Sequence, residues 1–337
     1  MKFLLITGSY RSGTTYLYKA FKNNKNCSLL YQPSIKFFKI LDQEIRMKLK
    51  KKSFKNFPLG ITKINKNLRL NNIFLKKKKI LNIIVSLMKF KCKNFIFYKK
   101  FYENIKLQND NIDAENYINI LFQSIKQIEK NKKKIYGIKE PFIGDILKLL
   151  IDIKNLYIIN LIRDPREIIY SRNYSSLKNH NDFKNKKHPV ILSSLICSRN
   201  MEVDLKLTKS NKYKTIKFDE LINDHKKIEK KIFKFLNLKI SLNINKIKKK
   251  NNWKINSSGN KGNFGANWSS QIKKDELAII EKICGKNFKK YNFTKQSKKK
   301  LCSENLIKNF CENPKKILSW TNKKIFLKYL PKEIAKL

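Results

Sequence analysis

The sequence predicts an α/β protein with a central parallel sheet flanked by helices, and three observations support this fold class. Apolar runs typical of strands occur at residues 3–8, 135–139, 157–163 and 213–218, and helical patterns separate them. Two of these runs end in turns that open a helix, an arrangement that places ligands at the carboxyl edge of such a sheet. The chain has 337 residues and 41% hydrophobic content, which is enough to bury a substantial core.

The first strand runs directly into a Gly-x-x-x-x-Gly turn, from Gly8 to Gly13, and a helical pattern follows. Glycine lets the backbone turn tightly and approach a ligand closely. The first amides of a helix have no partner inside the helix, and they lie at the positive end of the helix dipole. The sequence therefore predicts an anion-binding loop here, with Thr14 and Thr15 at the start of the helix.

The position of the cation separates this loop from that of an NTP-hydrolysing protein. Such a loop reads Gly-x-x-x-x-Gly-Lys-Ser/Thr, and its lysine reaches the β- and γ-phosphates. Here Thr14 replaces the lysine, and the positive charge lies within the loop at Arg11, between Tyr10 and Ser12. A single phosphate can be held by amides and hydroxyls, whereas a metal-bound polyphosphate would lack its main counter-charge.

A second strand-to-helix turn follows the run at 157–163. Arg163 ends the strand, Asp164 is a suitable helix N-cap, Pro165 suits the first helical position, and Ser171 lies on the same helix. Only seven of the 77 basic residues are arginine, and four of the seven lie in these two segments. Arginine grips an oxyanion with two parallel hydrogen bonds, which lysine cannot do, so this clustering favours anion binding.

These segments resemble those of the sulfotransferases that use 3′-phosphoadenosine 5′-phosphosulfate, PAPS, as the donor. The sequence Arg-Ser-Gly-Thr-Thr is similar to the family's 5′-phosphosulfate loop, in the form typical of enzymes acting on carbohydrates and proteins. The resemblance implies a P-loop-like sulfotransferase fold and a 3′-phosphate site at Arg163 and Ser171. The residues implied around the 5′-phosphosulfate are Tyr10, Arg11, Ser12, Gly13, Thr14 and Thr15.

Two weaker matches complete the expected donor site. The segment 258–268 resembles the family's Arg-Lys-Gly-x-x-Gly-x-Trp loop, which closes over the 3′-phosphate. Lys261 and Gly262 match it, but Asn260 replaces the usual arginine, which implies a weaker grip or another compensating cation. Phe218 stands at the family's tyrosine position and is a candidate to stack on adenine, with simple core packing as the alternative.

The resemblance places a cation beside the transferred group at Lys139, within the sequence Tyr-Gly-Ile-Lys-Glu-Pro. No histidine follows it, and the three histidines lie in polar, lysine-rich segments typical of a solvated surface. Gln32 occupies the position of a glutamate that often acts as the base, and an amide cannot take a proton at neutral pH. Glu140 is the candidate base by position, with a simple ion pair to Lys139 as the alternative.

The expected reaction requires little covalent chemistry from the protein. Sulfuryl transfer resembles phosphoryl transfer in that it depends on in-line positioning and on neutralising the leaving oxygen, here by Arg11 and Lys139. No carboxylates, histidines or cysteines have metal-ligand spacing, so no metal is expected. The acceptor carries a hydroxyl or an amine. Sugars, lipids, peptide tyrosines and small metabolites all stay open, and the first loop favours a carbohydrate or glycolipid.

One catalytic domain is expected over residues 1–285. Within this domain, residues 35–130 are expected to form a helical insertion suited to acceptor recognition. After it, residues 286–337 are expected to form a basic helical extension packed on the domain. Met1 leads almost directly into the first strand, the apolar run at 80–88 is too short to span a bilayer, and no Cys-x-x-Cys pair occurs. A cytoplasmic protein with reduced thiols and no transmembrane segment is expected. The sequence does not predict an oligomeric state.

The formal net charge of +52 is compatible with binding to nucleic acids or membranes. The lysines are spread along the whole chain, however, as a compositional bias would produce, so no specific nucleic-acid partner is expected. Two alternatives to a sulfotransferase remain. A nucleotide kinase or related P-loop phosphotransferase would bind Mg-ATP tightly, and a non-catalytic polyanion-binding protein would show no preference for adenosine 3′,5′-bisphosphate.

Overall fold

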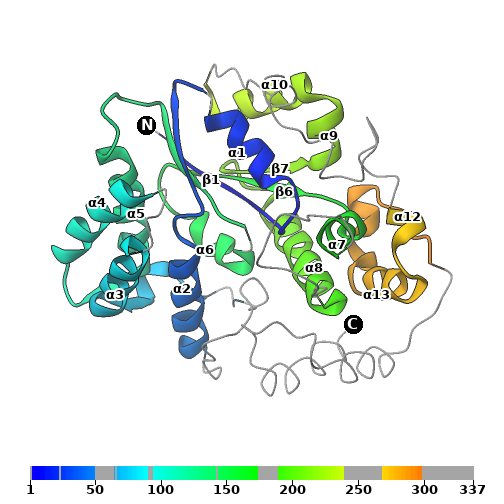
Figure 1. Ribbon diagram of the computed structural model, residues 1–337, viewed down its shortest axis with the longest axis horizontal. Helices are drawn as coiled ribbons and strands as arrows, with labels where there is room; N and C mark the ends of the chain where they lie inside the picture. Colours follow the sequence, from blue (N-terminus) through cyan, green and yellow to red (C-terminus); the bar gives the residue numbers. More distant parts are fainter. Residues whose placement is uncertain are drawn as a thin grey trace.

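A five-stranded sheet forms the centre of the protein in the computed structural model, and all its strands are parallel (Figure 1). The structure describes residues 2–22, 24–49, 64, 67–89, 94–141, 143–173, 189–238 and 268–297. The strand order is β2-β5-β1-β6-β7. The strands are β1 (Lys2–Gly8), β2 (Cys27–Tyr31), β5 (Ile135–Lys139), β6 (Leu156–Ile162) and β7 (Tyr213–Lys217). The predicted α/β fold class with a parallel sheet is confirmed.

Four of the five strands lie within one residue of the predicted ranges. The fifth strand, β2, is not predicted from the sequence; it is a five-residue edge strand paired only with β5. Its run is short and ends half-buried and exposed, so it lacks the continuous apolar pattern of the central strands.

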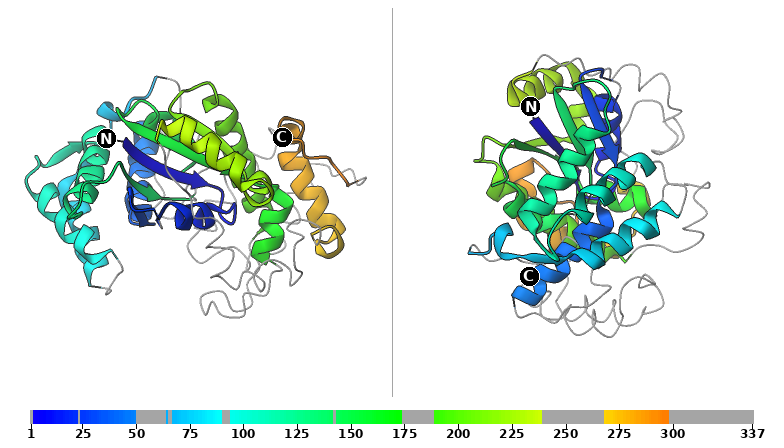
Figure 2. Two further views of the ribbon diagram at one scale, coloured as in Figure 1. Left: turned by 90° about the horizontal axis from the view of Figure 1, so that it is seen from above. Right: turned by 90° about the vertical axis from the view of Figure 1, so that its left-hand side faces the viewer.

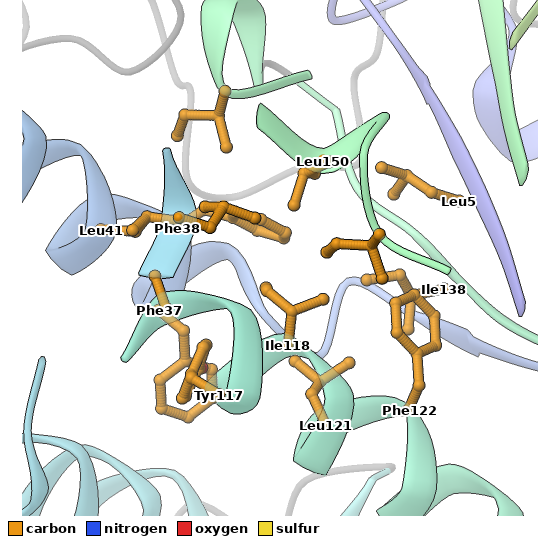
Figure 3. Packing of buried hydrophobic residues seen from close by; sticks show 14 of the residues in the cluster. Leu5, Phe37, Phe38, Leu41, Tyr117, Ile118, Leu121, Phe122, Ile138 and Leu150 are labelled. Carbon is orange, nitrogen blue, oxygen red and sulfur yellow. The ribbon is translucent and has the colours of Figure 1, made fainter. Parts of the chain in front are cut away.

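Helices cover both faces of the sheet. Side chains of β1 point alternately to opposite faces, and because they are apolar on both, each face needs a covering layer. Phe3 and Leu5 pack in one buried cluster, and Leu4 and Ile6 pack in a second. The helices of the second cluster are α1 (Thr14–Lys22), α9 (Phe218–Asn223) and α10 (His225–Leu236). The first cluster lies against α2 (Ile35–Lys48), α5 (Ala114–Gln127), η2 (Gly144–Ile146) and α6 (Leu147–Leu150), and Figure 3 shows its aromatic and aliphatic side chains in contact.

The described residues of the segment 35–130 are mainly helical and extend the first cluster at one end of the molecule (Figures 1 and 2). It also contains a short antiparallel strand pair that was not predicted. Three-residue strands are too short to show a period-two pattern, which explains the omission. The remaining elements of this segment are η1 (Leu70–Asn72), β3 (Phe74–Lys76), α3 (Lys77–Met88), α4 (Phe95–Lys106) and β4 (Asn111–Asp113).

A third buried cluster lies at the other end of the sheet (Figure 2). It is formed by α7 (Pro165–Asn173), α8 (Val190–Leu207), α12 (Trp268–Gln271), α13 (Lys274–Cys284) and η5 (Gly285–Tyr291). Phe288 and Tyr291 pack in this cluster, so the described start of the C-terminal segment contacts the domain. Residues 298–337 lie outside the described part of the chain. No helix among the described residues is both long and apolar enough to cross a bilayer.

A buried carboxylate ties the third cluster to the sheet. Asp204 of α8 is fully buried, and its Oδ1 accepts hydrogen bonds from Asn160 Nδ2 at 2.7 Å, the Tyr213 hydroxyl at 2.8 Å and the Thr215 hydroxyl at 2.7 Å. Its Oδ2 accepts a hydrogen bond from the Tyr291 hydroxyl at 2.8 Å. One side chain thus holds β6, β7 and η5 together, and a buried polar group is stable only when such partners are present.

Replacing Asp204 with alanine should lower the free energy of unfolding by about 3–5 kcal/mol, because several buried donors lose their common acceptor. Denaturant unfolding of the full chain measures this change. Asp152→Ala is the control, because Asp152 forms only an exposed ion pair with Arg69, which contributes about 0–1 kcal/mol. Equal losses in the two variants would contradict a structural role for the Asp204 network.

Candidate functional site

The first turn of the site joins β1 to α1. Gly8 has φ +151° and Gly13 has φ +95°, backbone conformations that favour glycine, and Arg11 lies between them at φ 70°. The Ser12 amide donates to the Ser9 carbonyl at 3.1 Å, which closes the turn. Because α1 begins at Thr14, its first amides have no acceptor within the helix and point toward the turn. The strand, loop and helix predicted from the sequence are therefore all present.

The second turn joins β6 to α7 and lies beside the first. Asp164 Oδ1 accepts a hydrogen bond from the Arg166 amide at 2.9 Å, so Asp164 caps α7 as predicted. Because β1 and β6 are adjacent parallel strands, both turns lie at the same edge of the sheet. Arg163 Nη1 donates to the Arg11 carbonyl at 3.1 Å, and Arg11 Nε donates to Ser171 Oγ at 3.2 Å. The structure thus brings together the two turns that the sequence analysis singled out.

Carboxylates flank the Arg163 guanidinium. Arg163 Nε donates to Glu167 Oε2 at 2.8 Å, and both side chains are about nine-tenths buried. Burial raises the pKa of Glu167 to about 7, although Arg163 opposes the shift. Burial also raises the pKa of Asp219, and again Arg163 opposes it. Arg163 is therefore fixed in place by an internal partner whose charge changes near neutral pH.

Phe218 packs in the core between the two turns. Its side chain is 3% exposed, it begins α9 rather than ending β7, and the Arg163 guanidinium lies 4.5 Å from its ring centre. A Cβ atom added to Gly13 would lie 2.2 Å from its ring. Phe218 is therefore packed in the core, which agrees with the core-packing alternative. Stacking on adenine stays a prediction.

Lys139 ends β5, the neighbour of β1 on its other side, where it pairs with Ile6. Its side chain is 3% exposed, and its Nζ lies 4.5 Å from the centre of the Tyr31 ring. Burial lowers the pKa of Lys139 to about 8, and the Glu140 carboxylate opposes the shift. The cation expected beside the reacting group thus lies at the same sheet edge as both turns.

Glu140 follows Lys139 but is fully buried. Its Oε1 accepts a hydrogen bond from the Ser34 amide at the start of α2, and its Oε2 has no hydrogen-bond partner among the described residues. Burial raises the pKa of Glu140 to about 8, against the effects of the Ser34 amide and Lys139. The described contacts contain no ion pair between Lys139 and Glu140, so the simple ion-pair alternative is not observed.

Three residues of the site were not predicted from the sequence. Glu167 was missed although it lies one helical turn from Arg163, a spacing that favours an ion pair. Arg172 follows Ser171, and its guanidinium lies 4.9 Å from the centre of the Tyr10 ring. Tyr31 ends the unpredicted strand β2, so no local pattern pointed to it.

Some predicted residues lie outside the described part of the chain. Lys261 and Gly262 are among them, together with most of the loop at 258–268, so the expected closure over the 3′-phosphate stays a prediction. Within the described ranges, no group of three or more histidine, cysteine, aspartate or glutamate side chains could hold a metal ion.

Gly13→Ala should lower the free energy of unfolding by about 2–4 kcal/mol, because alanine is strained at positive φ and its methyl group meets the Phe218 ring. In a Phe218→Ala background the cost should fall by about half and not vanish, because the backbone strain remains. Gly285→Ala is the control, since its added methyl group meets only the flexible end of Lys295. Denaturant unfolding of all four variants tests the contact, and an unchanged cost of Gly13→Ala in the Phe218→Ala background would contradict it.

No protein-family model matches this chain, and no curated protein matches it either. The chain is similar to solved structures of sulfotransferases. The sulfotransferase domain of the Synechococcus PCC 7002 olefin synthase is 15% identical with a TM-score of 0.45, and the match covers 83% of this chain and 93% of that domain. The sulfotransferase STF9 from Mycobacterium avium is 11% identical with a TM-score of 0.46, covering 87% and 77%. Mouse sulfotransferase SULT7A1, complexed with PAP, is 11% identical with a TM-score of 0.44, covering 86% and 85%.

Proposed function

We propose that this protein is a PAPS-dependent sulfotransferase that transfers a sulfuryl group to a hydroxyl-bearing acceptor. One observation carries the proposal. Arg163 Nη1 donates to the Arg11 carbonyl, and Arg11 Nε donates to Ser171 Oγ, so two anion-binding turns from separate strands adjoin. Adjoining anion sites suit a ligand with phosphate groups at both ends, which distinguishes PAPS from ATP.

The residues at the two turns fit the two ends of this donor. The first amides of α1, with Arg11, suit the 5′-phosphosulfate, because a helix N-terminus and a guanidinium both favour an oxyanion. Arg163 and Ser171 suit the 3′-phosphate, and Lys261 and Gly262 complete that end of the proposed site. When bound, the donor supplies an activated sulfuryl group on a phosphate leaving group. The protein holds this group in line with the acceptor hydroxyl and disfavours other relative orientations of the two.

Charge neutralisation is the main catalytic task in this proposal. Arg11 in the loop and Lys139 at the end of β5 counter the negative charge that develops on the leaving oxygen. Buried cations are effective in this role because the surroundings screen them weakly and they need no reorganisation. The Tyr31 ring helps to hold Lys139 in place.

Glu140 is the proposed acceptor of the proton that the acceptor hydroxyl loses. Its Oε2 is the carboxylate oxygen without a described hydrogen-bond partner, and its Oε1 is held by the Ser34 amide. Burial raises the pKa of Glu140 to about 8, which strengthens the carboxylate as a base and lowers its ionised fraction at neutral pH. A base of this kind contributes about 10²–10⁴ in rate, so transfer depends more on positioning and charge.

The proposed acceptor is a hydroxyl on a carbohydrate or glycolipid, recognised by the helical insertion at 35–130 of a catalytic domain spanning 1–285. The contacts of α4 with the turn after β2 support this role, because Asn94 Nδ2 donates to the Tyr31 carbonyl at 3.2 Å and the Tyr98 hydroxyl donates to the Pro33 carbonyl at 2.9 Å. We assign the protein to the cytoplasm, and the segment 286–337 to a basic extension packed on the domain.

Arg163→Ala should weaken binding of adenosine 3′,5′-bisphosphate by about 2–3 kcal/mol, roughly a hundredfold, because a charge-assisted contact to the 3′-phosphate is lost. Isothermal titration of the bisphosphate and of Mg-ATP into both proteins measures the effect. Wild type should prefer the bisphosphate, and the variant should lose that preference. Arg69→Ala, at an exposed ion pair, is the control.

Equal affinity of the wild type for the two ligands would reject the donor assignment and favour a kinase. Binding that depends strongly on salt and ignores nucleotide structure would favour the polyanion-binding alternative.

Lys139→Met should lower the rate of transfer of labelled sulfate from PAPS by about 10²–10³, because a buried cation at the leaving oxygen is lost. Burial brings the pKa of Lys139 down to about 8 and that of Glu140 up to about 8, so the wild-type kcat/KM should pass through a maximum near pH 8. It rises as Glu140 becomes ionised, and it falls at higher pH as the Lys139 ammonium loses its proton. Lys139→Arg should keep its charge and shift this decline to higher pH. An unchanged alkaline decline in Lys139→Met would contradict the role of Lys139.

A further inference from the structure

We propose that Tyr31 is the acceptor-orienting residue of the site, and that it selects a hydroxyl-bearing ring with an apolar face. This inference rests on the proposed function, since it concerns the acceptor of the same reaction. It is based on the position of the Tyr31 side chain between Thr15 and Lys139 at the sheet edge. The Tyr31 hydroxyl lies 3.5 Å from Thr15 Oγ1 at the start of α1, and the Lys139 ammonium lies 4.5 Å from the centre of the Tyr31 ring.

The backbone of Tyr31 is held by two neighbours, β5 and Asn94. It pairs with Lys139 in the parallel register of β2 and β5, and the Gln32 amide donates to the Lys139 carbonyl at 3.0 Å. Asn94 Nδ2, at the start of α4, donates to the Tyr31 carbonyl at 3.2 Å. Gln32 has φ 48°, so the chain turns sharply directly after Tyr31. The sheet and the helical insertion together therefore fix the position of this residue.

The side chain of Tyr31 is also constrained. Its ring centre lies 5.4 Å from that of Tyr18, and the rings meet edge-on at 65°. Together with the Thr15 and Lys139 contacts, three groups from α1 and β5 surround one aromatic side chain. Placing a ring in this way costs little conformational entropy, since tyrosine has only two rotatable side-chain bonds.

Despite these contacts, Tyr31 is 42% exposed. The Lys139 side chain against its ring is only 3% exposed, and Thr15 beside its hydroxyl is half-buried. A tyrosine that served only to shield the Lys139 ammonium would be expected to be buried with it. Instead, Tyr31 is partly open to solvent beside the groups proposed to hold the transferred sulfuryl group.

The chemistry of this surface indicates the class of acceptor. The phenol hydroxyl both donates and accepts hydrogen bonds, so it can orient an acceptor hydroxyl beside Thr15. The ring offers an apolar face on which another ring packs, a contact worth about 0.5–1.5 kcal/mol. An acceptor that combines a hydroxyl with an apolar ring face uses both features, and an open-chain alcohol uses only the first. Phenols and pyranose sugars share this chemistry.

Ligand-observed saturation-transfer NMR of the full chain, with adenosine 3′,5′-bisphosphate present, tests the inference. The probes are 4-methylphenol, methyl β-glucopyranoside and the open-chain 1-pentanol. Wild type should bind at least one ring probe more strongly than 1-pentanol. Tyr31→Ala should weaken that binding by about tenfold, and Tyr31→Phe by less, because the ring contact remains. Phe235→Ala is the matched control, since Phe235 is a half-buried aromatic residue on α10, outside the segment 35–130, and packs against Tyr157.

A transfer assay with the ring probe that binds gives a second readout. In Tyr31→Ala the acceptor KM should rise about tenfold while the KM for PAPS changes by less than about twofold, a separation that general unfolding would not produce. Thermal denaturation confirms that the variant is folded.

Three results would overturn the assignment. They are equal binding of the ring probes by wild type and Tyr31→Ala, binding of 1-pentanol as strong as that of the rings, and failure of wild type to bind any ring probe while it binds the bisphosphate. Failure of wild type to bind the bisphosphate is a separate result, which rejects the proposed function itself. Binding of only the phenol or only the glucoside identifies which ring class the protein uses and supports the inference.

Discussion

The parallel pairing of β1 with β6 is the constraint on which the rest of the site depends. It aligns Gly8 with Leu161, so the turn after each strand begins at the same level of the sheet edge. The Arg163 side chain then reaches the Arg11 carbonyl, and the N-termini of α1 and α7 lie next to each other. Without this register the two turns would be separate. With it, they adjoin along one sheet edge, where we propose that a ligand with negative charge at both ends binds.

The contacts at the site also explain which cations are used. The chain carries a net charge of +52, almost all of its positive charge on lysine, yet arginine carries the contacts between the two turns. Arg11 is held by Ser171 and Arg163 by Glu167, contacts that use the planar fork of donors. The lysine that takes part, Lys139, is held by an aromatic face and by burial. The abundance of surface lysine therefore does not determine the arrangement of charge at the site.

The sequence predicts the parts of this structure that have strong local signals. The glycine spacing from Gly8 to Gly13 and the Asp164 cap depend on a few neighbouring residues, and both are present. Other features depend on contacts between distant segments. Phe218 was a candidate from the sequence, but its close packing against Gly13 is visible only once the turn after β1 and the end of β7 are placed together. Tyr31 matters because β2 pairs with β5, and β2 is too short and too mixed in polarity to be predicted.

The turn after β2 connects the proposed donor and acceptor sites physically. The buried Glu140 carboxylate accepts a hydrogen bond from the Ser34 amide. Asn94, which precedes α4, and Tyr98 of α4 donate hydrogen bonds to the Tyr31 and Pro33 carbonyls. The donor turns lie on β1 and β6 and make none of these described contacts with α4. A change in α4 would therefore reach Tyr31 directly, and through Tyr31 it would reach Thr15 and Lys139. The turn after β6 makes none of these described contacts, so we expect the proposed 3′-phosphate end of the site to depend least on the helical insertion.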